Sequence, residues 1–203
     1  MTSPKAVVFD LGKVLLDFDY GIAVSQIQAF CKLSLAELQK LINQSPLLHR
    51  YETNLLSTAE FFAEVQAVSG FCGSFDQFQA MFADIFTPIE PMVALHRQVR
   101  ARGVPTYVFS NTNDLAIRHI RARFPFFRHF DGYILSYEQN LMKPDPRIYA
   151  VVEQMANRQG ADLLYIDDRL ENLLPGQERG WQTILHQDPQ TSEAALRKSG
   201  VLS

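Results

Sequence analysis

The sequence predicts an α/β protein, a doubly wound parallel sheet with a small bundle of α-helices inserted after its first strand. The apolar run 6–9 is short, unbroken and β-branched at its centre, as in strands buried on both faces of a parallel sheet. From residue 22 to residue 86 the pattern is purely helical, and after Pro88 helices and strands alternate. Such alternation indicates parallel strands joined by helices.

The first strand runs directly into Asp10, and the inserted block follows it. Three capping boxes mark helix starts in this block, at Ser34–Glu37, Ser57–Glu60 and Ser74–Gln77. With an earlier amphipathic segment that begins near Ile22, they predict four helices with short connections. The expected division is therefore a core domain of residues 1–16 and 89–203 and a helical cap domain of residues 17–88.

Further strands and helices are expected in order after the block. The strands are residues 104–109, 132–135, 163–166 and 182–185. Gly103 is placed to end the helix before the first of them, and Asn113 to cap the helix after it. Asp145-Pro146 supplies an N-cap followed by proline at the first helical position. Pro175 fits the last predicted helix only if it lies in the first turn.

Composition excludes several classes of protein. The 203 residues include 19 basic and 22 acidic ones, a net charge of −3, so a general nucleic-acid surface is not expected. No apolar run approaches the ~20 residues that span a bilayer, and the N-terminus does not resemble a signal peptide. The two cysteines, Cys31 and Cys72, are expected to be buried free thiols. The expectation is a cytoplasmic protein that contacts neither membrane nor nucleic acid, with a monomer as the default state.

Polar side chains follow three of the predicted strands. Asp10 follows the first strand, Ser110-Asn111 the second and Asp167-Asp168 the fourth, while Lys143 lies in the loop after the third. Because ligands of open α/β sheets bind outside the carboxyl ends of the strands, these groups are expected to meet at one edge. Carboxylates and water are the ligands that Mg²⁺ prefers, so Asp10 and Asp168 could bind it directly and Asp167 through water. Ser110, the N–H of Asn111 and Lys143 would face a phosphoryl group, with Asp10 as nucleophile.

The same residues carry a resemblance. Phe9–Val14, Ser110–Asn113, Lys143–Tyr149 and Ile166–Asn172 resemble, in order and spacing, the four motifs of the haloacid dehalogenase-like (HAD) hydrolase superfamily. The inserted block is similar to that superfamily's helical cap, and the nearest branch contains bacterial sugar-phosphate phosphatases such as α-D-glucose-1-phosphate phosphatase. The resemblance implies a Rossmann-like core and a Mg²⁺-dependent phosphatase that works through an aspartyl-phosphate. It also implies that the metal is bound by Asp10, Asp168 and the main-chain carbonyl of Gly12.

Gly12 is a departure from the superfamily pattern. Most of its phosphatases carry a second aspartate at this position, which acts as general acid and base, although the sugar-phosphatase branch also has glycine here. A carbonyl ligand survives the change, but the proton donor does not. The sequence therefore predicts a preference for esters with good leaving groups, unless Lys13 or Glu52 supplies the proton.

Two other functions compete with a phosphatase. A metal-independent 2-haloacid dehalogenase also uses an aspartate nucleophile, but it has no need of the paired Asp167 and Asp168. A non-catalytic protein that binds a phosphorylated ligand or a protein partner would explain the missing acid at Gly12. It would not require all four of the residues Asp10, Ser110, Lys143 and Asp168.

The substrate itself is not predicted beyond a small phosphorylated metabolite. Because a cap closes over the site in this architecture, the leaving group would be recognised by cap residues and their neighbours. The candidates are Lys13, Tyr20, His49, Arg50 and Glu52.

Overall fold

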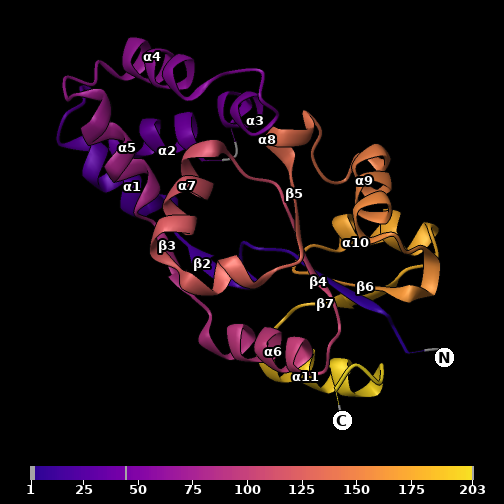
Figure 1. Ribbon diagram of the computed structural model, residues 1–203. Helices are drawn as coiled ribbons and strands as arrows, with labels where there is room; N and C mark the ends of the chain where they lie inside the picture. Colours follow the sequence, from indigo (N-terminus) through magenta and orange to yellow (C-terminus); the bar gives the residue numbers. More distant parts are fainter. Residues whose placement is uncertain (1–2, 44, 203) are drawn as a thin grey trace.

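A five-stranded parallel sheet forms the centre of the computed structural model, which describes residues 3–43 and 45–202 (Figure 1). The strand order is β5-β4-β1-β6-β7, and each neighbouring pair is parallel. The strands are β1 (Ala6–Phe9), β4 (Thr106–Ser110), β5 (Gly132–Leu135), β6 (Leu163–Asp167) and β7 (Gln182–Leu185). The predicted fold class is confirmed, and β1, as predicted, is fully buried.

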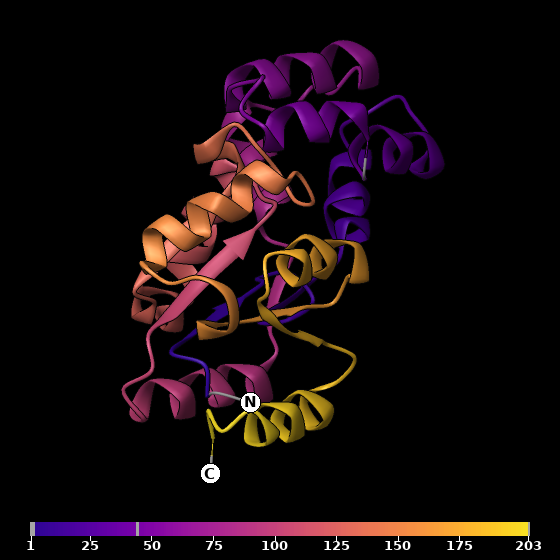
Figure 2. The same ribbon diagram turned by 90° about the vertical axis from the view of Figure 1, so that its right-hand side faces the viewer.

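Helices cover both faces of this sheet. Val7 and Phe9 point to one face, and Ala6 and Val8 point to the other, as the two-residue period of a strand requires. The first face packs against α6 (Glu90–Ala101), α7 (Asp114–Arg123) and α11 (Pro189–Lys198). The second packs against α9 (Pro146–Ala156) and α10 (Leu170–Glu178), which lie in front of the sheet in Figure 2.

The remaining elements of this part of the chain are short. Two 3₁₀-helices precede strands, η1 (Pro125–His129) before β5 and η2 (Gly160–Asp162) before β6. A single-turn helix, α8 (Ser136–Gln139), follows β5. Gly103 has the expected left-handed backbone after α6, with φ +74°, and the side chain of Asn113 caps α7.

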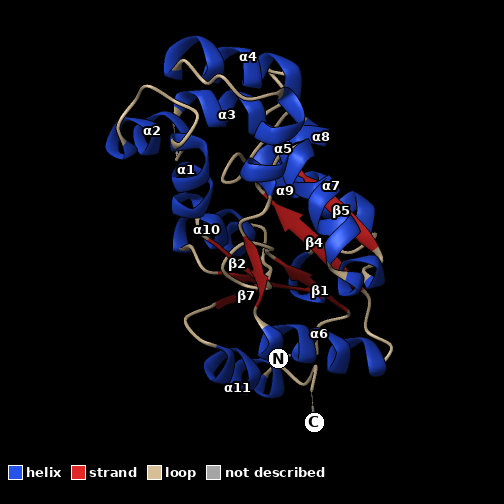
Figure 3. Ribbon diagram, turned by 90° about the vertical axis from the view of Figure 1, so that its left-hand side faces the viewer, coloured by secondary structure: helices blue, strands red, loops and turns tan. Residues whose placement is uncertain are grey.

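The residues between β1 and α6 form a separate group of helices, seen above the red strands in Figure 3. They are α1 (Tyr20–Gln28), α2 (Leu35–Ile42), α3 (Pro46–Glu52), α4 (Thr58–Ser69) and α5 (Phe75–Ala83). All three predicted capping boxes are formed. The group has its own apolar core, in which Phe61 stacks on Tyr51 with ring centroids 4.5 Å apart.

Two short antiparallel strands join this group to the sheet. They are β2 (Leu16–Phe18) and β3 (Phe86–Pro88), and they pair from Leu16 with Pro88 to Phe18 with Phe86. A second connection runs to α7, where the N–H of Leu115 donates to the hydroxyl of Tyr51 at 3.2 Å.

Three sequence expectations need correction. Five helices, not four, lie in the described part of the insertion, and α3 was missed because seven residues are too short for a clear period. Its signal was Ser45-Pro46, an N-cap followed by proline at the first helical position. Pro175 lies inside α10 rather than in its first turn. Proline has no N–H, so the carbonyl of Glu171, four residues earlier, receives no helical hydrogen bond. Glu171 is an exposed residue, which water can reach. Cys31 and Cys72 are free as expected, but neither is buried: Cys31 is half-buried and Cys72 is exposed.

Candidate active site

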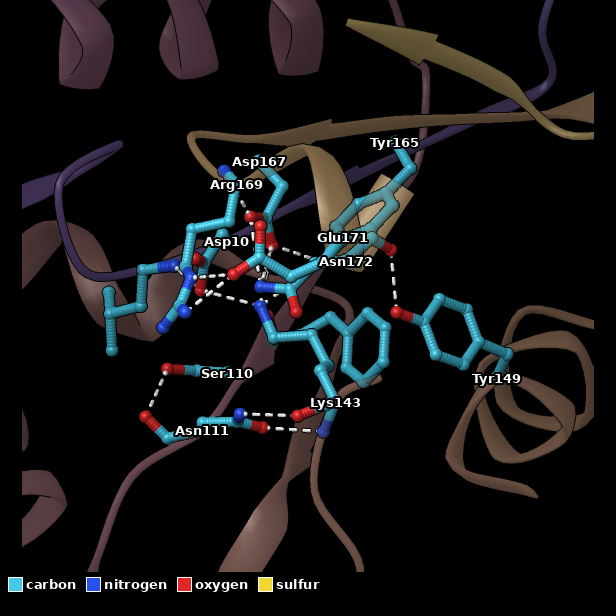
Figure 4. A network of polar contacts seen from close by, with 12 residues as sticks. Asp10, Ser110, Asn111, Lys143, Tyr149, Tyr165, Asp167, Arg169, Glu171 and Asn172 are labelled. Carbon is cyan, nitrogen blue, oxygen red and sulfur yellow. Dashed lines mark hydrogen bonds and ion pairs between the residues drawn. The ribbon is translucent and has the colours of Figure 1, made fainter. Parts of the chain in front are cut away.

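Asp10 lies immediately after β1, the central strand, at the carboxyl edge of the sheet (Figure 4). It is buried, and its Oδ1 accepts a hydrogen bond from the N–H of Leu11 at 2.7 Å. The same oxygen lies 3.0 Å from the Nζ of Lys143. Burial raises the pKa of Asp10 to about 8, against the opposing charge of Lys143 and with the help of the Asp167 charge.

Asp167 and Asp168 follow β6, the neighbouring strand. One carboxylate oxygen from each of Asp10, Asp167 and Asp168 lies within 4.8 Å of the other two. Asp167 is fully buried, whereas Asp168 is half-buried. Burial and the charge of Asp167 raise the pKa of Asp168. Burial also acts upward on the pKa of Asp167, but the charge and hydrogen bond of Lys143 outweigh it, and the pKa is lowered.

Lys143 is the cation of this cluster. Its Nζ lies 2.7 Å from Asp167 and donates to the carbonyl of Phe109 and to the hydroxyl of Tyr165, both at 3.0 Å. Burial lowers its pKa, but Asp10 and Asp167 outweigh this effect and raise it, so the side chain is charged. Three clustered carboxylates therefore face one ammonium group among the described residues.

Ser110 and Asn111 come from the end of β4, on the other side of β1. The side-chain amide of Asn111 fixes the main chain of Lys143: its Oδ1 accepts from the Lys143 N–H at 2.8 Å, and its Nδ2 donates to the Lys143 carbonyl at 3.0 Å. The hydroxyl of Ser110 makes a long hydrogen bond of 3.3 Å to the carbonyl of Asn111. All the sequence-predicted residues of the strand ends thus meet at one edge of the sheet.

Gly12 lies in the turn after Asp10, and a neighbouring ring occupies the space where a side chain at this position would lie. A Cβ at this position would come within 2.7 Å of the Phe18 ring. The ring, from β2, therefore fills the space that a second aspartate would enter. Lys13 borders the pocket around Asp10, but its Nζ pairs with Asp17 and donates to the carbonyl of Phe18 at 2.9 Å.

Glu52 reaches the site from α3. With Tyr20 and His49 it lines a cavity that also borders Gly12, Ser110 and Asn111. Burial raises the pKa of Glu52 to about 7. Arg50, by contrast, forms an ion pair with Glu64, at 2.8 Å, and does not line this cavity.

Sequence reasoning missed two residues that hold the carboxylates in place. The hydroxyl of Tyr165 donates to Asp167, and the amide of Asn172 donates to the same carboxylate at 3.0 Å. The N–H of Arg169 adds a third donor, at 2.8 Å. Tyr165 carried a weak signal, since its polar hydroxyl lies in the middle of a fully apolar strand, two residues before Asp167.

Comparison with known proteins decides the family. The family model of haloacid dehalogenase-like hydrolases matches residues 4–180. The chain is a haloacid dehalogenase-like hydrolase. The predicted superfamily and the predicted class of enzyme, a hydrolase, are therefore confirmed.

Two characterised relatives of this hydrolase are phosphatases. A sesquiterpene phosphatase of Aspergillus oryzae is 26% identical over 182 residues, which cover 88% of this chain and 88% of the relative. A D-ribitol-5-phosphate phosphatase of Bacteroides thetaiotaomicron is 25% identical over 189 residues, covering 89% of this chain and 90% of the relative. The names of the two relatives specify very different leaving groups.

A solved structure has the same fold. A HAD-family enzyme of Bacteroides thetaiotaomicron, in complex with magnesium and inorganic phosphate, superposes with a TM-score of 0.77 at 25% identity. The match covers 89% of this hydrolase and 93% of that chain.

In the described part of the hydrolase, none of the helices is both long enough and apolar enough to cross a membrane.

Proposed function

We propose that this hydrolase is a Mg²⁺-dependent phosphatase that cleaves small phosphomonoesters through an aspartyl-phosphate on Asp10. The observation that carries the proposal is the cluster of three carboxylates at the ends of two neighbouring strands, two of which are paired with one lysine. With all three carboxylates ionised, as metal binding requires, the cluster has an excess of negative charge that a divalent cation would balance. Two phosphatases among the relatives, and a related enzyme in complex with magnesium and phosphate, support it.

The donor set fits Mg²⁺. Asp10, Asp168 and the main-chain carbonyl of Gly12 would hold the ion, all of them hard oxygen ligands. Asp167 would contribute through water, because its two oxygens already accept hydrogen bonds from Lys143, Arg169 and other donors. Bound Mg²⁺ would neutralise phosphoryl oxygens and so let an anionic ester approach the Asp10 carboxylate.

The protein's own groups orient the ester and carry out the chemistry. Lys143, the Ser110 hydroxyl and the Asn111 N–H would bind the phosphoryl oxygens. An oxygen of Asp10 attacks phosphorus, the bond between phosphorus and the leaving oxygen breaks, and that oxygen takes up a proton. Water then attacks the phosphorus of the aspartyl-phosphate, and phosphate leaves while the Asp10 carboxylate is restored.

Glu52 is our candidate for the proton donor. Gly12 has no acid. Lys13 borders the pocket around Asp10, but its ammonium is paired with Asp17, and it does not line the cavity that Glu52 lines. Glu52 lines the cavity, and its pKa of about 7 keeps a large protonated fraction at neutral pH. An acid with a pKa near the working pH is the effective kind.

Glu52→Gln should slow hydrolysis of alkyl phosphates by about 10²-fold or more, and hydrolysis of aryl phosphates far less, because good leaving groups need no proton. The parent rate on alkyl phosphates should fall as pH rises through about 7, where Glu52 loses its proton, and this fall should be absent in the variant. Rates for esters graded by leaving-group pKa, measured across pH, test this. An equal loss for every ester would show that Glu52 is not the acid.

Gly12→Asp should destabilise the protein by about 1–3 kcal/mol, because the new side chain overpacks against the Phe18 ring. In combination with Phe18→Ala, the same substitution should cost clearly less. The measurement is a double-mutant cycle, which compares the unfolding free energies of the parent, the two single variants and the double variant. Additive effects would mean that Phe18 does not occupy the space of a residue-12 side chain.

The helical group of residues 17–88 would act as a cap on the core of residues 1–16 and 89–203. In this proposal the paired strands β2 and β3 are the hinge, since they are the covalent connections between the two parts. Closure would exclude water and bring Glu52 to the ester. The cytoplasmic location and the monomeric state stay predictions from the sequence.

Phosphate release from a panel of phosphomonoesters, with and without Mg²⁺, tests the proposal. We expect turnover that EDTA abolishes and that Mg²⁺ restores. Metal-independent chloride release from 2-chloropropionate would favour the dehalogenase instead. Phosphate binding without any turnover would favour the non-catalytic alternative.

A further inference from the structure

The pocket around Asp10 continues into a second cavity beneath the helical group. The catalytic pocket, which borders Asp10, Lys143 and Asp168, has a volume of about 480 Å³. The second cavity, here called the side chamber, has a volume of about 340 Å³. Gly12, Ser110 and several other residues border both. A phosphomonoester bound at Asp10 can therefore extend into the side chamber.

Apolar side chains make up much of the chamber wall. Besides Leu11, they come from the hinge strands, from α3, from α7 and from the loop before Lys143, and they are Phe18, Leu48, Phe86, Ala116, Ile120 and Met142. Leu48, Ala116 and Ile120 are buried, and Phe18 and Phe86 are half-buried. A hydrocarbon group bound against this wall gains affinity because it removes its own apolar surface, and that of the half-buried Phe18 and Phe86, from water.

Several polar residues of the wall are engaged in holding helices. The Ser45 hydroxyl accepts from the N–H of Leu48 at 3.0 Å and caps α3. The Asn113 side chain accepts from the N–H of Ala116 at 2.9 Å and caps α7. Oxygens committed in this way are poorly placed to bind the several hydroxyls of a polyol.

The chamber also lacks a free cation for a second acidic group. Arg169 is the only lysine or arginine among the described residues that line it, and its guanidinium lies 2.5 Å from Glu171. His49 is exposed, at the outer rim. Glu52, with Tyr20 facing it, would repel a carboxylate or a second phosphate when ionised.

Resting on the phosphatase function proposed above, we propose that the side chamber binds the leaving group of the substrate and selects an uncharged, largely apolar alcohol. The substrate class is then an alkyl, alicyclic or aryl phosphomonoester, rather than a sugar phosphate or a diacid. The single phosphate is bound at Asp10, and the hydrocarbon part lies against Phe18, Phe86 and Met142.

Values of kcat/KM for propyl, butyl and pentyl phosphate, with Mg²⁺, test this proposal. The leaving-group pKa hardly changes along the series, so differences report contacts with the hydrocarbon. We expect kcat/KM to rise about fourfold per methylene, the equivalent of ~0.8 kcal/mol, and roughly 15-fold from propyl to pentyl. The kcat/KM for propyl phosphate should also exceed that for glycerol 3-phosphate, although glycerol 3-phosphate has the better leaving group.

Ala116→Leu, which fills the chamber, should reduce the pentyl-to-propyl ratio to about 1. The matched control is Ala150→Leu on the exposed side of α9, which should keep the ratio. Should Ala116→Leu not fold, Met142→Gln changes the wall from a half-exposed loop and should lower the ratio several-fold.

The outcomes separate the two proposals. A flat series, or a preference for glycerol 3-phosphate, would overturn the chamber's role while leaving the phosphatase intact. If no ester were hydrolysed, including aryl phosphates, the phosphatase function and this inference would fall together.

Discussion

Asp10→Asn should abolish phosphomonoester hydrolysis while leaving the fold intact. The amide is nearly isosteric, and its oxygen can still accept from the N–H of Leu11 and from Lys143. It cannot form the aspartyl-phosphate, and loss of a catalytic nucleophile typically costs ~10⁴-fold or more. The measurement is kcat with saturating Mg²⁺, together with a thermal unfolding curve. Because the substitution removes one of three crowded carboxylates, the melting temperature without metal should not fall.

Asp188→Asn is the matched control. Asp188 caps α11, on the face of the sheet away from α9 and α10, and asparagine is an equally good cap. This variant should keep the parent kcat. Turnover by Asp10→Asn at the parent rate would remove Asp10 from the nucleophile's role.

Lys143→Met should both inactivate and destabilise the protein. The substitution leaves Asp10 and Asp167 buried without the cation that lies 3.0 and 2.7 Å from them. Breaking a buried ion pair by removing one partner typically costs 3–5 kcal/mol, so we expect a loss of about that size in the free energy of unfolding without Mg²⁺. Denaturant unfolding, with phosphate release as the second readout, measures both effects.

Two further variants control this experiment. Lys5→Met breaks the exposed pair with Asp162, also 3.0 Å long, and should cost no more than about 1 kcal/mol. Adding Asp167→Asn to Lys143→Met should recover part of the stability, since it removes a buried unpaired charge. If Lys143→Met and Lys5→Met lower the free energy of unfolding by the same amount, Lys143 does not stabilise the protein through the buried carboxylates.

Most of the candidate site could be predicted because each of its residues, apart from Lys143 and Glu52, lies at or just after the end of a buried strand. Once 6–9, 104–109 and 163–166 are recognised as parallel strands, the residues after them must share one edge of the sheet. Strand ends are also local, because an apolar run ends at a polar residue, and the strands of the central sheet lie within about two residues of those expected. The short strands β2 and β3 were not predicted. Helix starts were equally clear, because capping boxes are formed by residues three apart in the chain.

The features that sequence reasoning missed depend on how the backbone turns between elements and on where the helices pack, which no residue pattern indicates. No local pattern indicates that the Phe18 ring fills the space beside Gly12. The hydrogen bonds from Tyr165 and Asn172 to Asp167 form because of the path that the backbone takes from β6 into α10. Glu52 was one of five candidates for recognising the leaving group. Only the position of the unpredicted helix α3 shows that Glu52 lines the cavity and that Arg50 pairs with Glu64 instead.

The most direct test of the account is chemical trapping of the aspartyl-phosphate. The hydrolase is mixed with a ³²P-labelled phosphomonoester and Mg²⁺, quenched in acid during turnover, and digested. We predict a base-labile, hydroxylamine-sensitive label on the peptide that contains Asp10, and none when Mg²⁺ is withheld or Asp10→Asn is used. Phosphate release with no such label, or a label on a peptide without Asp10, would contradict the account.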